Sequence, residues 1–139
     1  MEKDLKDILL KDLCARLPYE VKIQYEDNIF TIDYISAMYE EIKLNTSNRY
    51  TIDVLEVKPY LFPLSSMTKE QKEELKSLGW NFDNFEIHNV SECLGTYREY
   101  VAHSDCFALI NWLNKNHFDY RCLIEKSLAL DATNLGIYE

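Results

Sequence analysis

The hydrophobic periodicity changes abruptly at Pro18, and this change constrains the fold more than any other feature. Before Pro18, apolar residues recur at helical spacing over Glu2–Leu17, and aspartates near the start suit the helix dipole. After Pro18, the residues from Val21 to Tyr25 alternate between apolar and polar side chains, as in a half-buried strand. The sequence therefore predicts an N-terminal helix that ends at Pro18 and is followed directly by a β region.

The alternation continues and indicates four short strands between Val21 and Val57, linked mainly as hairpins. A meander this short curls into a small barrel or packs its open face against a helix. We therefore expect an antiparallel, SH3-like β-barrel within about residues 19–64. Pro59 and Pro63 are expected to end the β region, because proline donates no hydrogen bond to a ladder.

Helical signals return after the second of these prolines. Thr68 and Gln71 have the spacing of a capping box at a helix start, and Gly79 is placed to close that helix. Aromatic and β-branched residues within 80–102 indicate a hairpin, and Ser104 is expected to cap a further helix. The expected fold class is α+β: helix, barrel, helix, hairpin and C-terminal helix.

Length and composition suit one soluble domain. The 139 residues form a single expected domain, 1–139, with a barrel-like core at about 19–64 and a helix-rich half at about 65–139. The longest uncharged stretch has ten residues, which is too short to cross a membrane. The N-terminus lacks the basic and apolar regions of a signal peptide, so we expect a cytoplasmic protein without membrane association.

Charge narrows the class of partner. The chain has 24 acidic and 15 basic residues, a net charge of −9, which disfavours direct nucleic-acid binding. Residues 19–64 carry eight acidic and four basic side chains, so an acidic face could meet a basic protein partner. The chain's three glycines are not clustered, which excludes a Walker loop and a dinucleotide fingerprint, and no cofactor is expected.

Tyrosines supply the candidate binding residues. The chain has ten, and several fall in or beside the β region. Aromatic side chains on a barrel face bury large areas at low entropic cost, so they serve well as protein-binding anchors. They are also ordinary strand formers. The candidate binding residues are Tyr25, Tyr34, Tyr50 and Tyr60.

A metal-dependent nuclease is the first alternative. Asp53 and Glu56 would hold a magnesium ion, and Lys58 would stabilise developing charge. Residues two apart on a strand point to one face, so the spacing of Glu56 and Lys58 permits this site. The negative net charge and the proline that follows Lys58 favour an ordinary exposed charge pair instead.

A zinc-stabilised structural subunit is the second alternative. His88, Cys93, His103 and Cys106 place two imidazoles and two thiols within nineteen residues. Zinc accepts both ligand types in a tetrahedral shell. No Cys-x-x-Cys pair is present, so buried thiols and surface imidazoles are the competing interpretation.

Three parts of the sequence carry a resemblance to a known family: Lys11–Tyr19, Glu56–Thr68, and Trp112–Arg121 together with Leu123–Asp131. They resemble a family of small uncharacterised proteins encoded by Bacteroides-type gut bacteria, their phages and mobile elements. The resemblance brings no established activity and therefore no catalytic residue. It implies a protein that binds and modulates a host protein or a defence system, rather than an enzyme.

The resemblance also leads us to expect glycine at three positions where this chain has other residues. These positions are Glu20, Cys122 and Ser127. The function predicted from the sequence is a non-catalytic, acidic protein-binding module.

Overall fold

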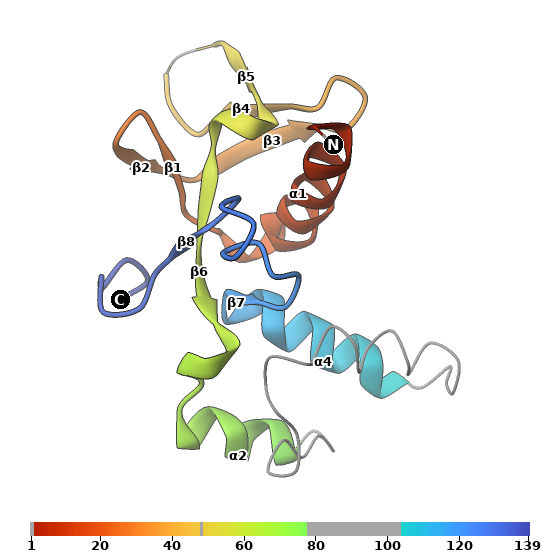
Figure 1. The fold of residues 1–139 in the computed structure, drawn as a ribbon, viewed down its shortest axis with the longest axis vertical. Coiled ribbons are helices and arrows are strands. Elements are labelled where there is room, and N and C mark those ends of the chain that lie inside the picture. The colour runs from red at the N-terminus through yellow and green to blue at the C-terminus, as the bar shows by residue number, and fades with distance from the viewer. Residues whose placement is uncertain (1, 48, 78–103) are drawn as a thin grey trace.

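The computed structural model describes residues 2–47, 49–77 and 104–139, and it confirms the α+β class (Figure 1). Its helices are α1 (Glu2–Arg16), α2 (Lys69–Ser77) and α4 (Ser104–Lys115). Three 3-10 turns are η1 (Leu17–Tyr19), η2 (Val54–Glu56) and η3 (Leu64–Ser66). In the described parts, no helix has the length and apolar character needed to cross a bilayer.

The strands form two small sheets. One has the order β2-β1-β6-β7, with β8 also paired to β6, and the other has the order β3-β4-β5. The strands are β1 (Ile23–Tyr25), β2 (Asn28–Phe30), β3 (Ile32–Ser36), β4 (Glu41–Leu44), β5 (Thr51–Asp53), β6 (Lys58–Pro63), β7 (Phe118–Asp119) and β8 (Leu130–Asp131). Only Thr31 separates β2 from β3, so the chain passes there from one sheet to the other. The described strands do not close into a barrel.

The predicted N-terminal helix is confirmed as α1, and it covers the inner face of the three-stranded sheet. Leu9 and Leu13 are fully buried in one cluster with Ile42 of β4 and Val54 of η2. Pro18 lies in η1, where its fixed φ and missing N–H suit the first positions of a tight turn. The capping box is also confirmed, since Thr68 and Gln71 exchange hydrogen bonds at the start of α2.

The expectation that the β region ends at these prolines is wrong for Pro59, which lies within β6, whereas Pro63 is the last residue of that strand. Both belong to β6, which pairs antiparallel with β1 and parallel with β7 and β8. Tyr60 donates its N–H toward β1, so the nitrogens of Pro59 and Pro63 face the opposite side. There β8 pairs only with Tyr60 and Leu61. The pairing with β8 therefore requires no backbone N–H from Pro59 or Pro63.

Strand β6 links the two hydrophobic clusters of the described residues. Leu61 packs in the cluster beneath α1, and Leu64, just beyond β6, belongs to a second cluster. This second cluster includes Leu75 of α2 and Leu113 of α4. The long central strand therefore connects two adjoining cores (Figure 1).

A buried ionic network joins α1 to the C-terminal segment. Asp12 and Arg16 have fully buried side chains and form two hydrogen bonds, at 2.8 and 3.1 Å. Arg121 adds a third contact to Asp12, at 2.7 Å, and Arg16 also donates to the carbonyl of Phe118. Both guanidinium groups lie over the ring of Tyr120. We call these residues the Asp12 network.

The three positions where glycine was expected share a backbone conformation. Glu20, Cys122 and Ser127 have φ values of 55°, 59° and 61°, in the left-handed region. L-residues other than glycine, asparagine and aspartate adopt this region at a cost. The expectation of glycine there thus has a backbone reason, although this chain uses other residues.

Candidate functional site

The structure separates the four candidate tyrosines. Tyr34 and Tyr50 are 49% and 76% exposed. Tyr25 is half-buried and packs against Phe30, with ring centroids 6.5 Å apart. Tyr60 is only 7% exposed, because β6 is a central strand and its side chain packs inside the molecule. Tyr60 is therefore not a surface anchor, contrary to the sequence interpretation.

Large exposed apolar side chains nevertheless gather in the β region. Over the described residues, six such side chains are between 49% and 83% exposed, and only Leu135 lies elsewhere. We call the other five the exposed rim: Ile29, Tyr34, Met38, Tyr39 and Tyr50. Soluble proteins expose single apolar residues routinely, and these five are candidates for an interaction surface because they fall in one part of the fold.

Strand pairing places four of the five rim residues on or beside the three-stranded sheet, whereas Ile29 lies in β2 of the other sheet. Met38 and Tyr39 lie in the turn between β3 and β4, and Tyr50 lies just before β5. The turn and the segment leading into β5 lie at opposite ends of this sheet (Figure 1). Met38 was missed because the sequence pattern assigned binding to tyrosines. The sequence signal that could have identified Met38 is its position in a short turn between the polar residues Ser36 and Glu40.

The nuclease residues do not form a common strand face. The carboxylate of Asp53 caps η2, accepting from the N–H of Leu55 and from Nζ of Lys6, each at 2.9 Å. These hydrogen bonds, the Leu55 bond first, lower the pKa of Asp53. Glu56 ends η2 whereas Lys58 begins β6. Within the described ranges, no three His, Cys, Asp or Glu side chains could hold a metal ion.

The structure does not test the proposed zinc site, because three of its four residues are not described. His88, Cys93 and His103 lie outside the described residues. Cys106 belongs to α4, but the structure does not describe the surroundings of its side chain. The zinc alternative therefore stays a prediction.

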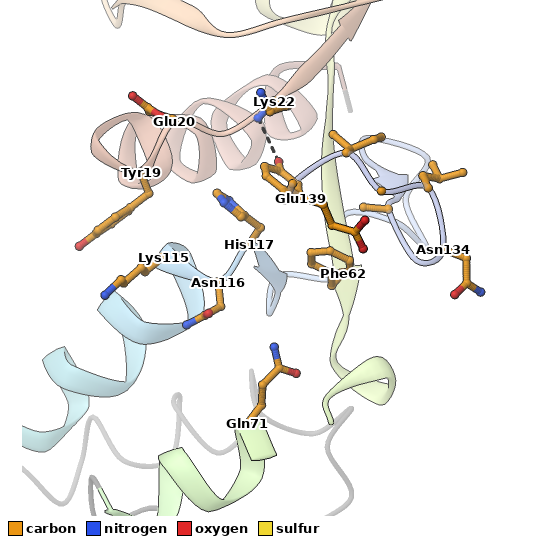
Figure 2. A pocket seen from close by; sticks show the side chains of 15 residues that line it. Tyr19, Glu20, Lys22, Phe62, Gln71, Lys115, Asn116, His117, Asn134 and Glu139 are labelled. Carbon is orange, nitrogen blue, oxygen red and sulfur yellow. Dashed lines mark hydrogen bonds between the residues drawn. The ribbon is translucent and has the colours of Figure 1, made fainter. Parts of the chain in front are cut away.

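A pocket of about 1000 Å³ forms where five segments that are distant in the sequence meet (Figure 2). Its walls come from η1 and the residues after it, β6, α2, the end of α4, and the C-terminal segment 132–139. No periodic pattern predicts this meeting, because four of the five segments contribute three residues or fewer.

Two stacked rings form part of the pocket wall. The imidazole of His117 lies on the ring of Tyr138, with centroids 3.8 Å apart and planes inclined by 12°. The Tyr138 hydroxyl donates to the carbonyl of Tyr60 and accepts from the N–H of Lys22. Burial raises the pKa of Tyr138 to about 12. This hydroxyl thus fixes the C-terminal segment to β6 and to the chain before β1.

His117 is neutral in this wall at pH 7. Burial, aided by the positive charges of Arg16 and Lys22, lowers the pKa of His117 to about 4. Its Nδ1 is buried and has no hydrogen-bond partner among the described residues. Protonation of His117 would place a positive charge near those of Arg16 and Lys22, in a site from which water is partly excluded.

The low pKa of His117 predicts a loss of stability in acid. The unfolded chain binds this proton near pH 6.5 and the folded chain only near pH 4, so stability falls as pH drops between these values. Since the ring is partly exposed, we expect a loss of about 1 kcal/mol between pH 7 and pH 5. Urea unfolding of the wild type and of His117→Phe, which retains a ring to stack, measures it. Equal pH dependence in both proteins would contradict the assignment.

Comparisons with known proteins give no relative. No protein-family model, no curated protein and no solved structure matches the chain.

Proposed function

We propose that the chain is a non-catalytic protein-binding module that recognises its partner through the exposed rim. The observation that carries this proposal is that five of the six large, exposed apolar side chains among the described residues fall within residues 29–50. Tyrosine and methionine are enriched in protein interfaces, where they supply large contact areas. Ile29 and Tyr34 lie on hydrogen-bonded strands, and the N–H of Tyr39 donates to the hydroxyl of Ser36 in its turn, so these anchors are held in place before binding.

Charge near the rim supports a basic partner. Glu26, Asp27 and Asp33 are exposed in this region, against one exposed cation among its described residues, Arg49 beside Tyr50. Lys43 is 9% exposed and its Nζ donates to the carbonyls of Leu44 and Thr46, so it offers little charge to a partner. A positively charged protein surface would complement this acidic surround and be attracted over long range. The resemblance noted above leads us to propose a host protein as that partner.

The strand order supports an SH3-like arrangement as the scaffold of this module. β1, β2 and β6 form one sheet, β3, β4 and β5 form the other, and Thr31 joins the two. The 3-10 turn η2 then leads from β5 to β6, which returns to pair with β1. Two small sheets that share one bent strand segment and are connected in this order are typical of SH3-like folds. Such a scaffold presents its turns and connecting loops to a partner.

An affinity capture from host-cell lysate tests the proposal. The bait is the full chain, and the comparison bait carries Tyr39→Ala and Tyr50→Ala. Both side chains are more than two-thirds exposed, so their removal should leave the fold intact. Leu135→Ala is the matched control, because among the described residues Leu135 is the large, exposed apolar side chain that lies outside the rim.

We expect one stoichiometric partner that the wild type and Leu135→Ala both retain. Its affinity for the double variant should be at least about tenfold lower, as expected when two anchor rings are lost. High salt should weaken the complex, because the charge attraction is screened. Capture of the same amount of partner by the double variant and the wild type would contradict the proposal.

A further inference from the structure

The pocket offers one hydrogen-bond donor group and one acceptor whose orientations are fixed by the fold. Oε1 of Gln71 accepts from the N–H of Thr68 in the capping box, at 2.8 Å, which leaves the amide NH₂ of Gln71 available. The NH₂ of Asn116 donates to the carbonyl of Trp112, at 2.9 Å, which leaves Oδ1 of Asn116 available. Both residues line the pocket, Gln71 from α2 and Asn116 from the end of α4 (Figure 2).

Aromatic rings line the same space. Phe62 of β6 lies 5.8 Å from the ring of Tyr138, which is itself stacked on His117. The imidazole is uncharged at pH 7, so this wall presents rings without a competing positive charge on them. A planar heterocycle can stack on such a surface while its polar edge meets the two amides.

The charged side chains limit what else the ligand can carry. Lys22 and Lys115 line the pocket, and neither has an ion-pair partner among the described side chains. Glu20 and Glu139 also line it, so the formal charge of the lining is zero in a chain of net charge −9. A lysine can hold one anionic group, but a polyphosphate would meet the carboxylates.

The geometry points to a binding site for a mononucleotide, a ligand that combines a planar nitrogen heterocycle with a single phosphate. The base would stack beside Phe62 and present its donor and acceptor edge to Gln71 and Asn116, and the phosphate would bind at Lys115. The volume of about 1000 Å³ is sufficient for a ligand of this size. The site is separate from the exposed rim, and it needs no glycine-rich loop because side chains supply the contacts.

Calorimetry and thermal shift with AMP, GMP, CMP and UMP test this site in the full chain. Inorganic phosphate, the corresponding nucleosides and a short single-stranded RNA are the comparison ligands. We expect at least one mononucleotide to bind more tightly than both its nucleoside and phosphate. Equal binding of phosphate alone, RNA binding without mononucleotide binding, or no binding at millimolar concentrations would each overturn the proposal.

Two variants locate the ligand. Gln71→Glu retains the oxygen that caps α2 but replaces the NH₂ donor with a carboxylate, so affinity should fall at least about tenfold. Lys115→Met should weaken the phosphate-bearing ligand about tenfold and the nucleoside little. The matched controls, Gln24→Glu and Lys126→Met, make the same changes outside the pocket. Unchanged affinity in both pocket variants would also reject the site, whereas Tyr39→Ala/Tyr50→Ala should bind the nucleotide as the wild type does.

Discussion

Replacing Asp12 by alanine is expected to lower the free energy of unfolding by about 3–5 kcal/mol. The Asp12 carboxylate is fully buried and is the ion-pair partner of both Arg16 and Arg121. Its removal leaves the guanidinium of Arg16 charged and enclosed, at 0% exposure; among the described residues, the Phe118 carbonyl and the Tyr120 ring are its remaining polar and ring contacts. The cost is therefore that of an unpaired buried charge rather than of a lost surface pair.

Urea unfolding at pH 7 measures this effect, and two further variants make it specific. Asp7→Ala removes a carboxylate from the same helix and should change stability by no more than about 0.5 kcal/mol, because Asp7 lies outside the network. Asp12→Leu combined with Arg16→Met removes both buried charges and should recover much of the loss. A cost below about 1 kcal/mol for Asp12→Ala would contradict the network's role in joining α1 to the C-terminal segment.

Introducing glycine at Glu20, Cys122 and Ser127 together should raise the free energy of unfolding by about 2 kcal/mol. Each residue has a left-handed backbone, which glycine adopts without steric cost. Each substitution should contribute about 0.5–1 kcal/mol, since the relief of strain exceeds the extra entropy that glycine gains when unfolded. None of the three side chains makes a hydrogen bond or an ion pair that would be lost, as far as the described residues show.

Thermal unfolding of the triple variant tests this expectation, with Lys126→Gly as the control. Lys126 is adjacent to Ser127 but does not have a positive φ, so glycine there should be neutral or destabilising. A triple variant that melts at or below the wild-type temperature would show that these backbones carry no strain.

Local signals in the sequence predicted the elements that depend on nearby residues. The helical spacing before Pro18, the alternation from Val21 and the capping box at Thr68 each involve neighbours a few positions apart. Arg16 illustrates the limit of such signals. Its position in the last helical turn suits the helix dipole, but its burial depends on Asp12, Phe118 and Arg121, two of which lie more than 100 positions away.

The C-terminal segment and the pocket could not be predicted for the same physical reason. β7 and β8 have two residues each and pair parallel to β6, so they show no period of their own. Pro59 of β6 was misinterpreted because its tolerance depends on which side of the strand β8 occupies. The candidate binding surface was partly predicted: Tyr34 and Tyr50 are exposed, whereas Tyr60 is buried by the central position of its strand.

Hydrogen–deuterium exchange of the full chain, with and without its captured partner, tests the central claim most directly. The rim proposal predicts slower exchange in peptides that cover residues 28–53, where β2 to β5 and their turns carry the exposed side chains. Peptides covering 115–139 should exchange at the same rate in both states. Protection confined to 115–139, with unchanged exchange over 28–53, would place the partner at the pocket and contradict the account.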